Sequence, residues 1–569
     1  SNLDELMIVW RWSSPDNALS AFQNTAFEAT PLMVDGVLYT STSFSQVVAI
    51  NASDGTSIWT YDPQAYKYAR PPNNGFLHRG VSYIEGRPGK FIHMPTGDGR
   101  LISLNAISGE PVSQFGVLSN GVVDLLEGVP RLNESTMQLD DAHDQPDVPD
   151  FAGVVSQIGN SSPGIICRNT LVLGSSIHDG EVLPPSPPGD VRGFDPHSGE
   201  LLWTFHTVPR EGEFGVDTWM NESWKVNGNT NVWPPMSADE TLGMVYLPTG
   251  VPTNNYYGGR RHGDNLFANS VVALDCETGE RVWHFQTVHH DIWDYDLPAA
   301  PNLVDIEVEG QSIKALVQVT KQGFLFVFDR ETGEPVWPII ETPVPASDVP
   351  GELASATQPI PSWPLPFVRQ GSSRDDIVDQ TAVANYSFGP LYTPPTTNGL
   401  VITPGEGGGA NWGGAAFDPE TKVLYVVGFG PLTHVVTLQD GGQPDFYYGL
   451  PELLFGPVSA SPYGGDGSKI TAYNMNSGEI LWQVAGSSDS KTIGNSSVMI
   501  SGDLLYYKNS SLGTLNVFSK SDGELLREIP LGGRPTGSPM TYSIDGKQFV
   551  VIALGRQDEK MELVALSLP

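Results

Sequence analysis

The stretch ALDCETGERVW, residues 273–283, is one copy of a pattern that recurs along the chain. The pattern begins with a small or apolar residue, an apolar residue and then Asp or Asn. Three variable residues and a Gly follow, and a Trp or apolar residue stands four positions after the Gly. The Asp or Asn side chain can accept hydrogen bonds from turn amides, and Gly can take a positive φ, so each copy predicts a tight hairpin. The other copies are AINASDGTSIW (49–59), SLNAISGEPVS (103–113), GFDPHSGELLW (193–203), VFDRETGEPVW (327–337), AYNMNSGEILW (472–482) and the weaker VFSKSDGELLR (517–527).

A second hairpin precedes each copy, because apolar runs with turn residues recur at 31–40, 80–95, 163–173, 235–247, 300–319, 412–427, 497–507 and 538–554. These eight inner hairpins face seven outer ones. The strands at 8–12 and 561–568 would supply the missing outer pair, and their pairing would close a ring without an open edge. Units of this kind cannot bury their own faces and must pack side by side, with each Trp lying across a neighbouring turn. The sequence therefore predicts an all-β fold, an eight-bladed β-propeller of four-stranded blades.

We expect one domain over residues 1–569, with long loops at about 111–162, 338–392 and 430–468. The first carries an acidic run at 140–150, and the second is rich in Pro. Long loops on a rigid scaffold often shape a binding site or a partner surface. Decoration of an exposed face is the alternative.

The chain carries 30 Lys and Arg against 65 Asp and Glu, a formal charge of −35. Such a charge repels nucleic acid and anionic membrane surfaces, so neither is an expected partner. It suits cationic partners, or it simply keeps the protein soluble. No apolar run is long enough to span a bilayer. An abrupt start at Ser1 is what removal of a signal peptide leaves, so we expect a periplasmic or secreted protein.

Cys167 and Cys276 are the two cysteines of the chain. With no CxxC or CxxCH motif, the sequence offers no zinc ribbon and no covalently attached haem. We expect two buried thiols.

The richest polar cluster is HHDIWDYD, residues 289–296. By composition it could be a metal site, a catalytic base or a solvated corner. The sequence HHDIWDYDLPAAP closely resembles a motif of the dehydrogenases that depend on pyrroloquinoline quinone (PQQ). The resemblance is strongest to the branch that contains the membrane-bound glucose and the quinate/shikimate enzymes. The repeated hairpin resembles that family's tryptophan-docking motif, and the resemblance covers nearly the whole chain.

The resemblance implies a set of site residues. It makes Asp291 the catalytic base and Lys321 the basic residue that faces the quinone oxygens. The implied calcium ligands are Asp179, Thr253 and Asp291. The implied cofactor contacts, with Lys321, are Glu28, Arg79, Ser161, Ser176, Trp233, Asn411 and Trp412.

The chemistry of PQQ explains these residue types. A tricarboxylate needs cations and a flat stacking surface such as an indole. Ca²⁺ held by oxygen ligands would act as a Lewis acid on the reactive carbonyl. The resemblance therefore implies oxidation of a hydroxyl group of a sugar, polyol or cyclic alcohol, with Asp291 taking the proton and electrons passing to a separate acceptor such as a soluble cytochrome c.

The sequence also departs from the family pattern. It lacks the adjacent cysteines of the methanol branch, and His78 immediately precedes Arg79 where relatives place a histidine several residues earlier. VVIALGRQDEK replaces the usual Gly-Gly-His near the C-terminus, and Arg534 is a further candidate at the rim of the site. A propeller that has lost its cofactor and serves as a binding scaffold is therefore the main alternative. A hydrolase has little support, since neither a nucleophile elbow nor HExxH occurs.

Overall fold

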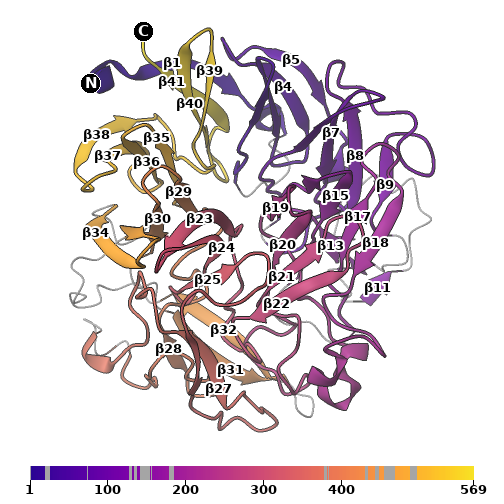
Figure 1. Ribbon diagram of the computed structural model, residues 1–569. Coiled ribbons are helices and arrows are strands. Elements are labelled where there is room, and N and C mark those ends of the chain that lie inside the picture. Colours follow the sequence, from indigo (N-terminus) through magenta and orange to yellow (C-terminus); the bar gives the residue numbers. More distant parts are fainter. Residues whose placement is uncertain are drawn as a thin grey trace.

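A computed structural model describes residues 2–19, 26–73, 75–126, 131–133, 138–140, 154–155, 157–178, 185–376, 381, 383–429, 434–441, 447–453, 468–486 and 496–569. The chain forms an eight-bladed β-propeller, as predicted (Figure 1). Seven blades are four-stranded sheets and one has three strands. Apolar clusters join neighbouring sheets; one packs Leu38 and Val48 of the first blade against Val551 and Leu563 of the last.

The strands of the first four blades follow the predicted hairpins, with one exception: the copy at 103–113 does not supply the fourth strand of the second blade, which lies beyond it at Val122–Asp124. They are β2 (Leu32–Val34), β3 (Val37–Ser41), β4 (Val47–Asn51) and β5 (Ser57–Tyr61); β6 (Ser82–Glu85), β7 (Lys90–Pro95), β8 (Arg100–Asn105) and β9 (Val122–Asp124); β14 (Ile165–Cys167), β15 (Thr170–Leu173), β17 (Val191–Phe194) and β18 (Leu201–Phe205); β19 (Ser237–Asp239), β20 (Met244–Pro248), β21 (Ser270–Asp275) and β22 (Arg281–Gln286).

The last four blades complete the ring. Their strands are β23 (Asn302–Val308), β24 (Gln311–Val319) and β25 (Leu325–Asp329); β29 (Ala415–Asp418), β30 (Val423–Gly428), β33 (Lys469–Asn474) and β34 (Glu479–Ala485); β35 (Val498–Ser501), β36 (Leu504–Asn509), β37 (Thr514–Ser519) and β38 (Leu525–Pro530); β39 (Met540–Ile544), β40 (Lys547–Leu554), β41 (Glu562–Ser567) and β1 (Met7–Ser13).

The eighth blade joins the two ends of the chain, as predicted. β1 pairs antiparallel with β41, from Met7 opposite Ser567 to Ser13 opposite Glu562. Both termini therefore lie at one blade (Figure 1).

The turn chemistry of the repeat is confirmed. In the copy at 273–283, Oδ1 of Asp275 accepts hydrogen bonds from the amides of Glu277 and Thr278, and Gly279 has a φ of +71°. A Cβ at Gly279 would lie 2.5 Å from the Trp203 ring of the preceding blade, and the Trp203 indole N–H donates to the carbonyl of Cys276 at 3.0 Å. Glycine is thus required for each Trp to lie across the next turn.

The copy at 327–337 differs from the prediction. Among the described residues this blade has no fourth strand: beyond β25 it is extended by a bridge between Phe328 and Pro335 and by a hydrogen bond from the amide of Val336 to the carbonyl of Val327. Pro335 has no N–H to add to the ladder. Trp337 does not reach the next turn. Trp363, from the second long loop, donates its indole N–H to the carbonyl of Ser477 at 2.7 Å and lies against Gly478.

The long loops carry further strands. They form a sheet of β10 (Arg131–Asn133), β11 (Gln138–Asp140) and β12 (Val154–Val155), a hairpin of β26 (Ile339–Pro343) and β27 (Thr357–Pro361), and a sheet of β28 (Leu400–Ile402), β31 (His434–Asp440) and β32 (Tyr447–Leu453). β13 (Ile158–Gly159) pairs with β16 (Ser176–Ile177). The helices of the described residues are 3-10 turns: η1 (Asn2–Glu5), η2 (Pro15–Ala18), η3 (Ala65–Lys67), η4 (Val216–Thr218), η5 (Met220–Lys225) and η6 (Arg374–Asp376).

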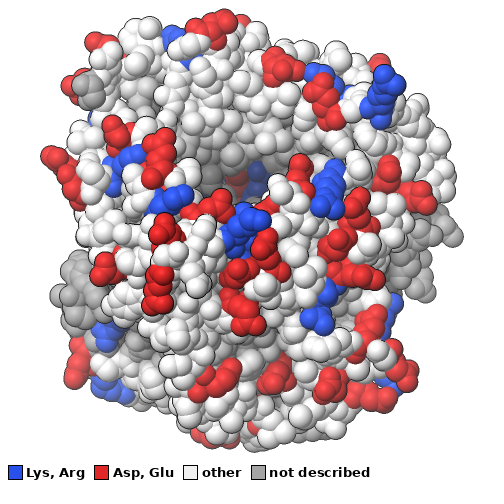
Figure 2. Space-filling model, viewed as in Figure 1, with Lys and Arg blue, Asp and Glu red and all other residues white. Residues whose placement is uncertain are grey.

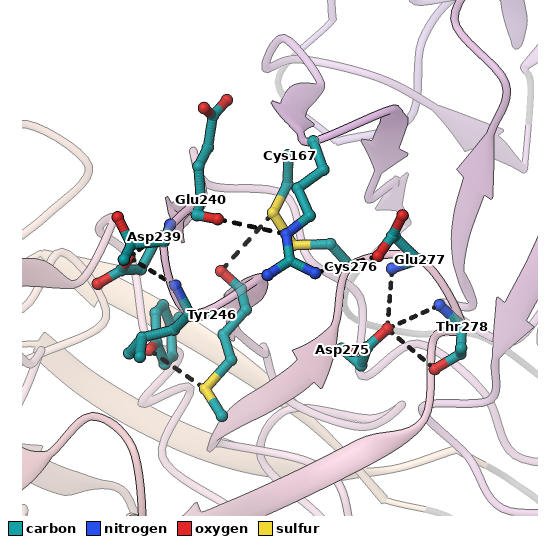
Figure 3. The surroundings of a disulfide bond; sticks show 12 residues. Cys167, Asp239, Glu240, Tyr246, Asp275, Cys276, Glu277 and Thr278 are labelled. Atoms are coloured by element: carbon teal, nitrogen blue, oxygen red, sulfur yellow. Dashed lines mark hydrogen bonds and ion pairs between the residues drawn. A yellow bond between two sulfur atoms is a disulfide. The ribbon is translucent and has the colours of Figure 1, made fainter.

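The expectation of two buried thiols is wrong. Cys167 and Cys276 form a disulfide across 109 residues of sequence (Figure 3). Cys167 ends β14, and Cys276 directly follows β21. The bond therefore joins the third blade to the fourth, beside the point where Trp203 docks. Both cysteines are fully buried, which spacing along the sequence could not distinguish from thiols that never meet.

The surface reflects the charge excess. Acidic side chains are spread over the visible face among fewer basic ones, and the face is hollowed near its centre (Figure 2). In the described part of the chain, every helix is too short or too polar to cross a membrane.

Candidate active site

A cavity of about 490 Å³ gathers side chains from many blades. Glu28, Arg79, Trp233 and Trp412 each lie shortly before the first strand of a blade, so the ring brings them together although they are far apart in sequence. Every residue expected to contact the cofactor lines this cavity: Glu28, Arg79, Ser161, Ser176, Trp233, Lys321, Asn411 and Trp412.

Arg79 anchors one end of the cavity. Its Nη2 lies 3.0 Å from Oε2 of Glu28, and its Nη1 donates to the hydroxyl of Ser161 at 2.9 Å. The guanidinium also lies 5.3 Å from the ring centroid of Trp233 and 5.0 Å from that of Trp412. The two indoles and the cation thus form one stacked group, in which cation–π attraction is strengthened by burial.

Lys321 is a second buried cation of the cavity wall. Its Nζ lies 3.2 Å from a carboxylate oxygen of Asp294 and 3.2 Å from one of Asp296. Burial alone would lower the pKa of Lys321, but the charges of the two carboxylates raise it, so the ammonium stays charged. Oδ2 of Asp296 also accepts the indole N–H of Trp233 at 3.2 Å, which ties the stacking surface to this ion pair.

Gly408 lets the loop before Trp412 close over Lys321. It has a φ of +75°, and a Cβ there would lie 2.6 Å from Cγ of Lys321. Asn411 donates its side-chain amide to the carbonyl of Gly407 at 3.0 Å, and its side-chain oxygen accepts the amide of Trp412. This loop therefore forms one wall of the cavity.

Asp291 lies outside the cavity lining. Its carboxylate accepts three hydrogen bonds, from the backbone amides of Trp293 and Tyr295 and the side chain of Asn269, at 2.7–2.8 Å. Burial raises its pKa to about 6, although these hydrogen bonds oppose the shift. With both oxygens bonded to protein, this carboxylate organises the loop; Asp294, three residues later, lines the cavity.

Neither Thr253 nor Asp291, two of the three expected calcium ligands, lines the cavity. Asp179 lies outside the described residues. The hydroxyl of Thr253 is within 2.9 Å of that of Ser186, away from the cavity lining, while Asn255 lines the cavity. In the described part of the chain, no three His, Cys, Asp or Glu side chains are grouped to hold a metal.

Sequence reasoning missed several residues of the site. His178, Asn255, Glu406 and Arg556 line the cavity, and each stands in a loop with no repeated pattern to mark it. Lys508 is also buried beside the site, with Nζ 4.8 Å from the ring centroid of Trp412. A lysine inside a strand of buried residues, YYKNS, was the signal for it.

The second long loop supports the polar segment at 289–296. Oε1 of Glu352 lies 2.7 Å from Nε2 of His290, and Nδ1 of His290 lies 2.7 Å from the carbonyl of Gly263. Oε2 of Glu352 accepts the amide of Gly258 at 2.5 Å. The hydroxyl of Tyr257 donates to Pro350 at 2.8 Å. This strut, residues 350–352 with their partners, fixes the loop that carries Asp294.

The cavity fits a flat anion. Two indoles offer apolar faces, and Arg79 and Lys321 offer two cations. The Nε of Arg79 is buried and, among the described residues, has no hydrogen-bond partner. A donor that is left without a partner at such a position is costly unless a ligand accepts from it. These residues fit PQQ, with its ring system and three carboxylates.

Comparison with known proteins also points to a PQQ-dependent protein. A model of the family described as "PQQ: Glucose/ethanol/alcohol dehydrogenase, beta-propeller domain" matches residues 1–447 and 448–550. Quinoprotein glucose dehydrogenase A of Acinetobacter calcoaceticus is 28% identical over 100% of this chain and 76% of its own length. Quinate/shikimate dehydrogenase (quinone) of Acinetobacter baylyi is 28% identical over 98% of this chain and 74% of its own.

A solved structure supports the fold. Quinohemoprotein alcohol dehydrogenase from Comamonas testosteroni superposes with a TM-score of 0.71 at 23% identity, over 100% of this chain and 77% of its own. Because the family model spans nearly the whole sequence, this chain belongs to the PQQ-dependent (quinoprotein) dehydrogenases.

Proposed function

We propose that this protein oxidises a hydroxyl group of a sugar, polyol or cyclic alcohol with PQQ and Ca²⁺ in the cavity. The observation that carries the proposal is the cavity itself, which is lined by two indoles, by Arg79 and by Lys321 with its ion-pair partners Asp294 and Asp296. The named relatives, which include glucose, quinate/shikimate and glycerol dehydrogenases, point to the same substrate class.

The cofactor would be held by the residues that line the cavity. Arg79 would bind a carboxylate, the indoles of Trp233 and Trp412 would face the ring system, and Lys321 would face the quinone oxygens. When bound, PQQ supplies a two-electron acceptor for the hydride that leaves the substrate carbon. Asp179 remains the proposed carboxylate ligand of Ca²⁺, and Asn255 is better placed than Thr253 because it lines the cavity.

We assign the general base to Asp294 in place of Asp291. The Asp294 carboxylate lines the cavity, whereas both oxygens of Asp291 accept hydrogen bonds from protein. Lys321 lies 3.2 Å from a carboxylate oxygen of Asp294, and a carboxylate within reach of the substrate can take the hydroxyl proton. Asp291 then acts by holding the turn that aims Asp294.

The proposal extends to the environment of the protein. The charge of −35 would attract a basic electron acceptor, such as a soluble cytochrome c, to the surface. A periplasmic or secreted location suits the disulfide, since such bonds persist in oxidising compartments.

A titration with PQQ and Ca²⁺ tests the proposal. We expect PQQ to quench the fluorescence of the cavity tryptophans, and the loaded protein to reduce a dye with glucose, glycerol or quinate. Absence of uptake with excess Ca²⁺ would contradict the proposal and leave a propeller that serves as a binding scaffold.

A further inference from the structure

The charges on the cavity wall are unevenly compensated. Arg79 pairs with Glu28, and Lys321 pairs with both Asp294 and Asp296. Glu406 also lines the cavity, yet among the described residues no ion pair joins it to a cation. It is therefore a carboxyl group that the protein places at the cavity without an ion-pair partner among the described residues.

The Glu406 carboxylate is held in place by neutral groups. Its Oε2 accepts the hydroxyl of Tyr256 at 2.7 Å, and its backbone N–H donates to Nδ1 of His434 at 3.0 Å. Burial, together with the charges of Asp294 and Glu406, holds the pKa of Tyr256 well above its usual range, so this hydroxyl remains a donor. Burial lowers the pKa of His434, which keeps the ring neutral. One carboxylate oxygen is thus fixed, and the other can accept from a ligand.

Glu406 stands at the end of the cavity that holds the proposed base. The loop that it begins crosses Lys321, because Gly409 donates its amide to the carbonyl of Lys321 at 2.5 Å. The charges of both Asp294 and Glu406 act on the hydroxyl of Tyr256. Arg556, an exposed cation of the wall, bridges to Ala26, two residues before Glu28.

We propose that Glu406 is a specificity-determining residue, an inference that rests on the proposed function. It accepts a hydrogen bond from a substrate hydroxyl other than the one that is oxidised. A carboxylate is a strong acceptor for a hydroxyl and repels another carboxylate, so this end of the cavity selects neutral polyhydroxy substrates against hydroxy acids. The substrate class is thereby narrowed to neutral sugars and polyols.

Steady-state oxidation by the PQQ-loaded protein tests this inference with Glu406→Gln. The substrates are a neutral polyol and a hydroxy acid of similar size, such as quinate. We expect KM for the polyol to rise about tenfold, because a charged acceptor is lost, while kcat/KM for the hydroxy acid rises as the repulsion is removed. Tyr256→Phe should change KM for the polyol and kcat/KM for the hydroxy acid in the same directions but by less. In this variant Glu406 keeps its carboxylate and loses only the hydroxyl that holds it in place.

Glu334→Gln is the matched control, because it removes one negative charge from an exposed turn far from the cavity lining. It should leave the preference between the two substrates unchanged. Equal effects of Glu406→Gln on both substrates would overturn the inference, and so would a loss of PQQ or Ca²⁺ affinity measured by fluorescence. Absence of PQQ uptake by the unaltered protein would overturn the proposed function and this inference together.

Discussion

Nε2 of His290 lies 2.7 Å from Oε1 of Glu352, and the two side chains are only 1% and 2% exposed. The imidazole of His290 lies between two hydrogen-bond acceptors, the carboxylate of Glu352 and the carbonyl of Gly263. A loop of the second insertion thus holds the segment that precedes Asp294. The insertion is part of the active-site scaffold, which decides between the two roles that the sequence left open for it.

Removal of the Glu352 charge should destabilise the protein. Glu352→Gln leaves the buried His290 without its carboxylate, and breaking a buried pair costs about 3 kcal/mol. Denaturant unfolding measures this loss. The neighbouring pair of His289 and Glu341 is the control: Glu341 is 53% exposed, so Glu341→Gln should change the free energy of unfolding by less than about 1 kcal/mol. If both variants lower the free energy of unfolding equally, Glu352 does not stabilise the protein in the way we expect.

The assignment of the base separates two aspartates. Asp294→Asn should lower dye-linked kcat about 100-fold or more, with PQQ binding retained, because the group that takes the proton is lost. Asp291→Asn should mainly lower the melting temperature, because the new side-chain NH₂ group would face the N–H groups that now donate to the Asp291 carboxylate. Turnover near normal in the first variant, with loss of turnover and normal stability in the second, would restore the base to Asp291.

The pH dependence of stability offers a second test of Asp291. Its pKa in the folded protein, about 6, lies above the ordinary value of 3.8. The folded state therefore holds this proton more tightly, and the resulting stabilisation is complete below pH 3.8 and is lost as the pH rises through 6. Asp291→Asn should remove this decline from melting curves recorded between pH 4 and 7, and an unchanged profile would contradict the shift.

Lys508 should act in the opposite direction. Burial, with the nearby charge of Arg79 and against that of Glu28, lowers its pKa to about 7 from 10.5. The unfolded chain then binds more protons than the folded one between pH 7 and 10.5. The contribution of this group to the free energy of unfolding therefore increases as the pH rises. Lys508→Met should flatten that rise in urea unfolding. Lys314→Met, at an exposed lysine, should leave it intact.

Loss of the disulfide should weaken the ring without emptying the cavity. Replacement of both Cys167 and Cys276 by Ser releases a constraint across 109 residues and should cost about 3 kcal/mol. PQQ binding should persist, because neither residue lines the cavity. Denaturant unfolding with and without a reductant checks the first expectation, and a protein that is insensitive to reductant would contradict it.

The repeat made the blades predictable, since each copy carries its own turn residues and strands. Departures from it were not. Trp363 docks where Trp337 was the only tryptophan in register, because prolines end the hairpin at 327–337 and a loop supplies the substitute. The disulfide depends on two strand ends that meet only after the third and fourth blades have packed.

The candidate site was predictable where the sequence matches motifs of the family. Arg79, Trp233 and Lys321 all line the cavity. The choice between Asp291 and Asp294 was not available from spacing, because left-handed conformations at His290 and Asp294 turn neighbouring side chains in different directions. Glu352 and Glu406 are single acids in loops, and only tertiary contacts distinguish them from solvated charges.

The pairing of β1 with β41 sets the order in which the protein can be completed during synthesis. Among the strands of the propeller, the one at Met7–Ser13 leaves the ribosome before all others, and its partner at Glu562–Ser567 leaves after them. Until then, the nascent chain carries an unpaired edge at each end of a growing arc, and such edges associate with one another. Pairing of β41 with β1 converts that arc into a closed ring, so the period in which unpaired edges can drive aggregation ends only when the eighth blade is complete.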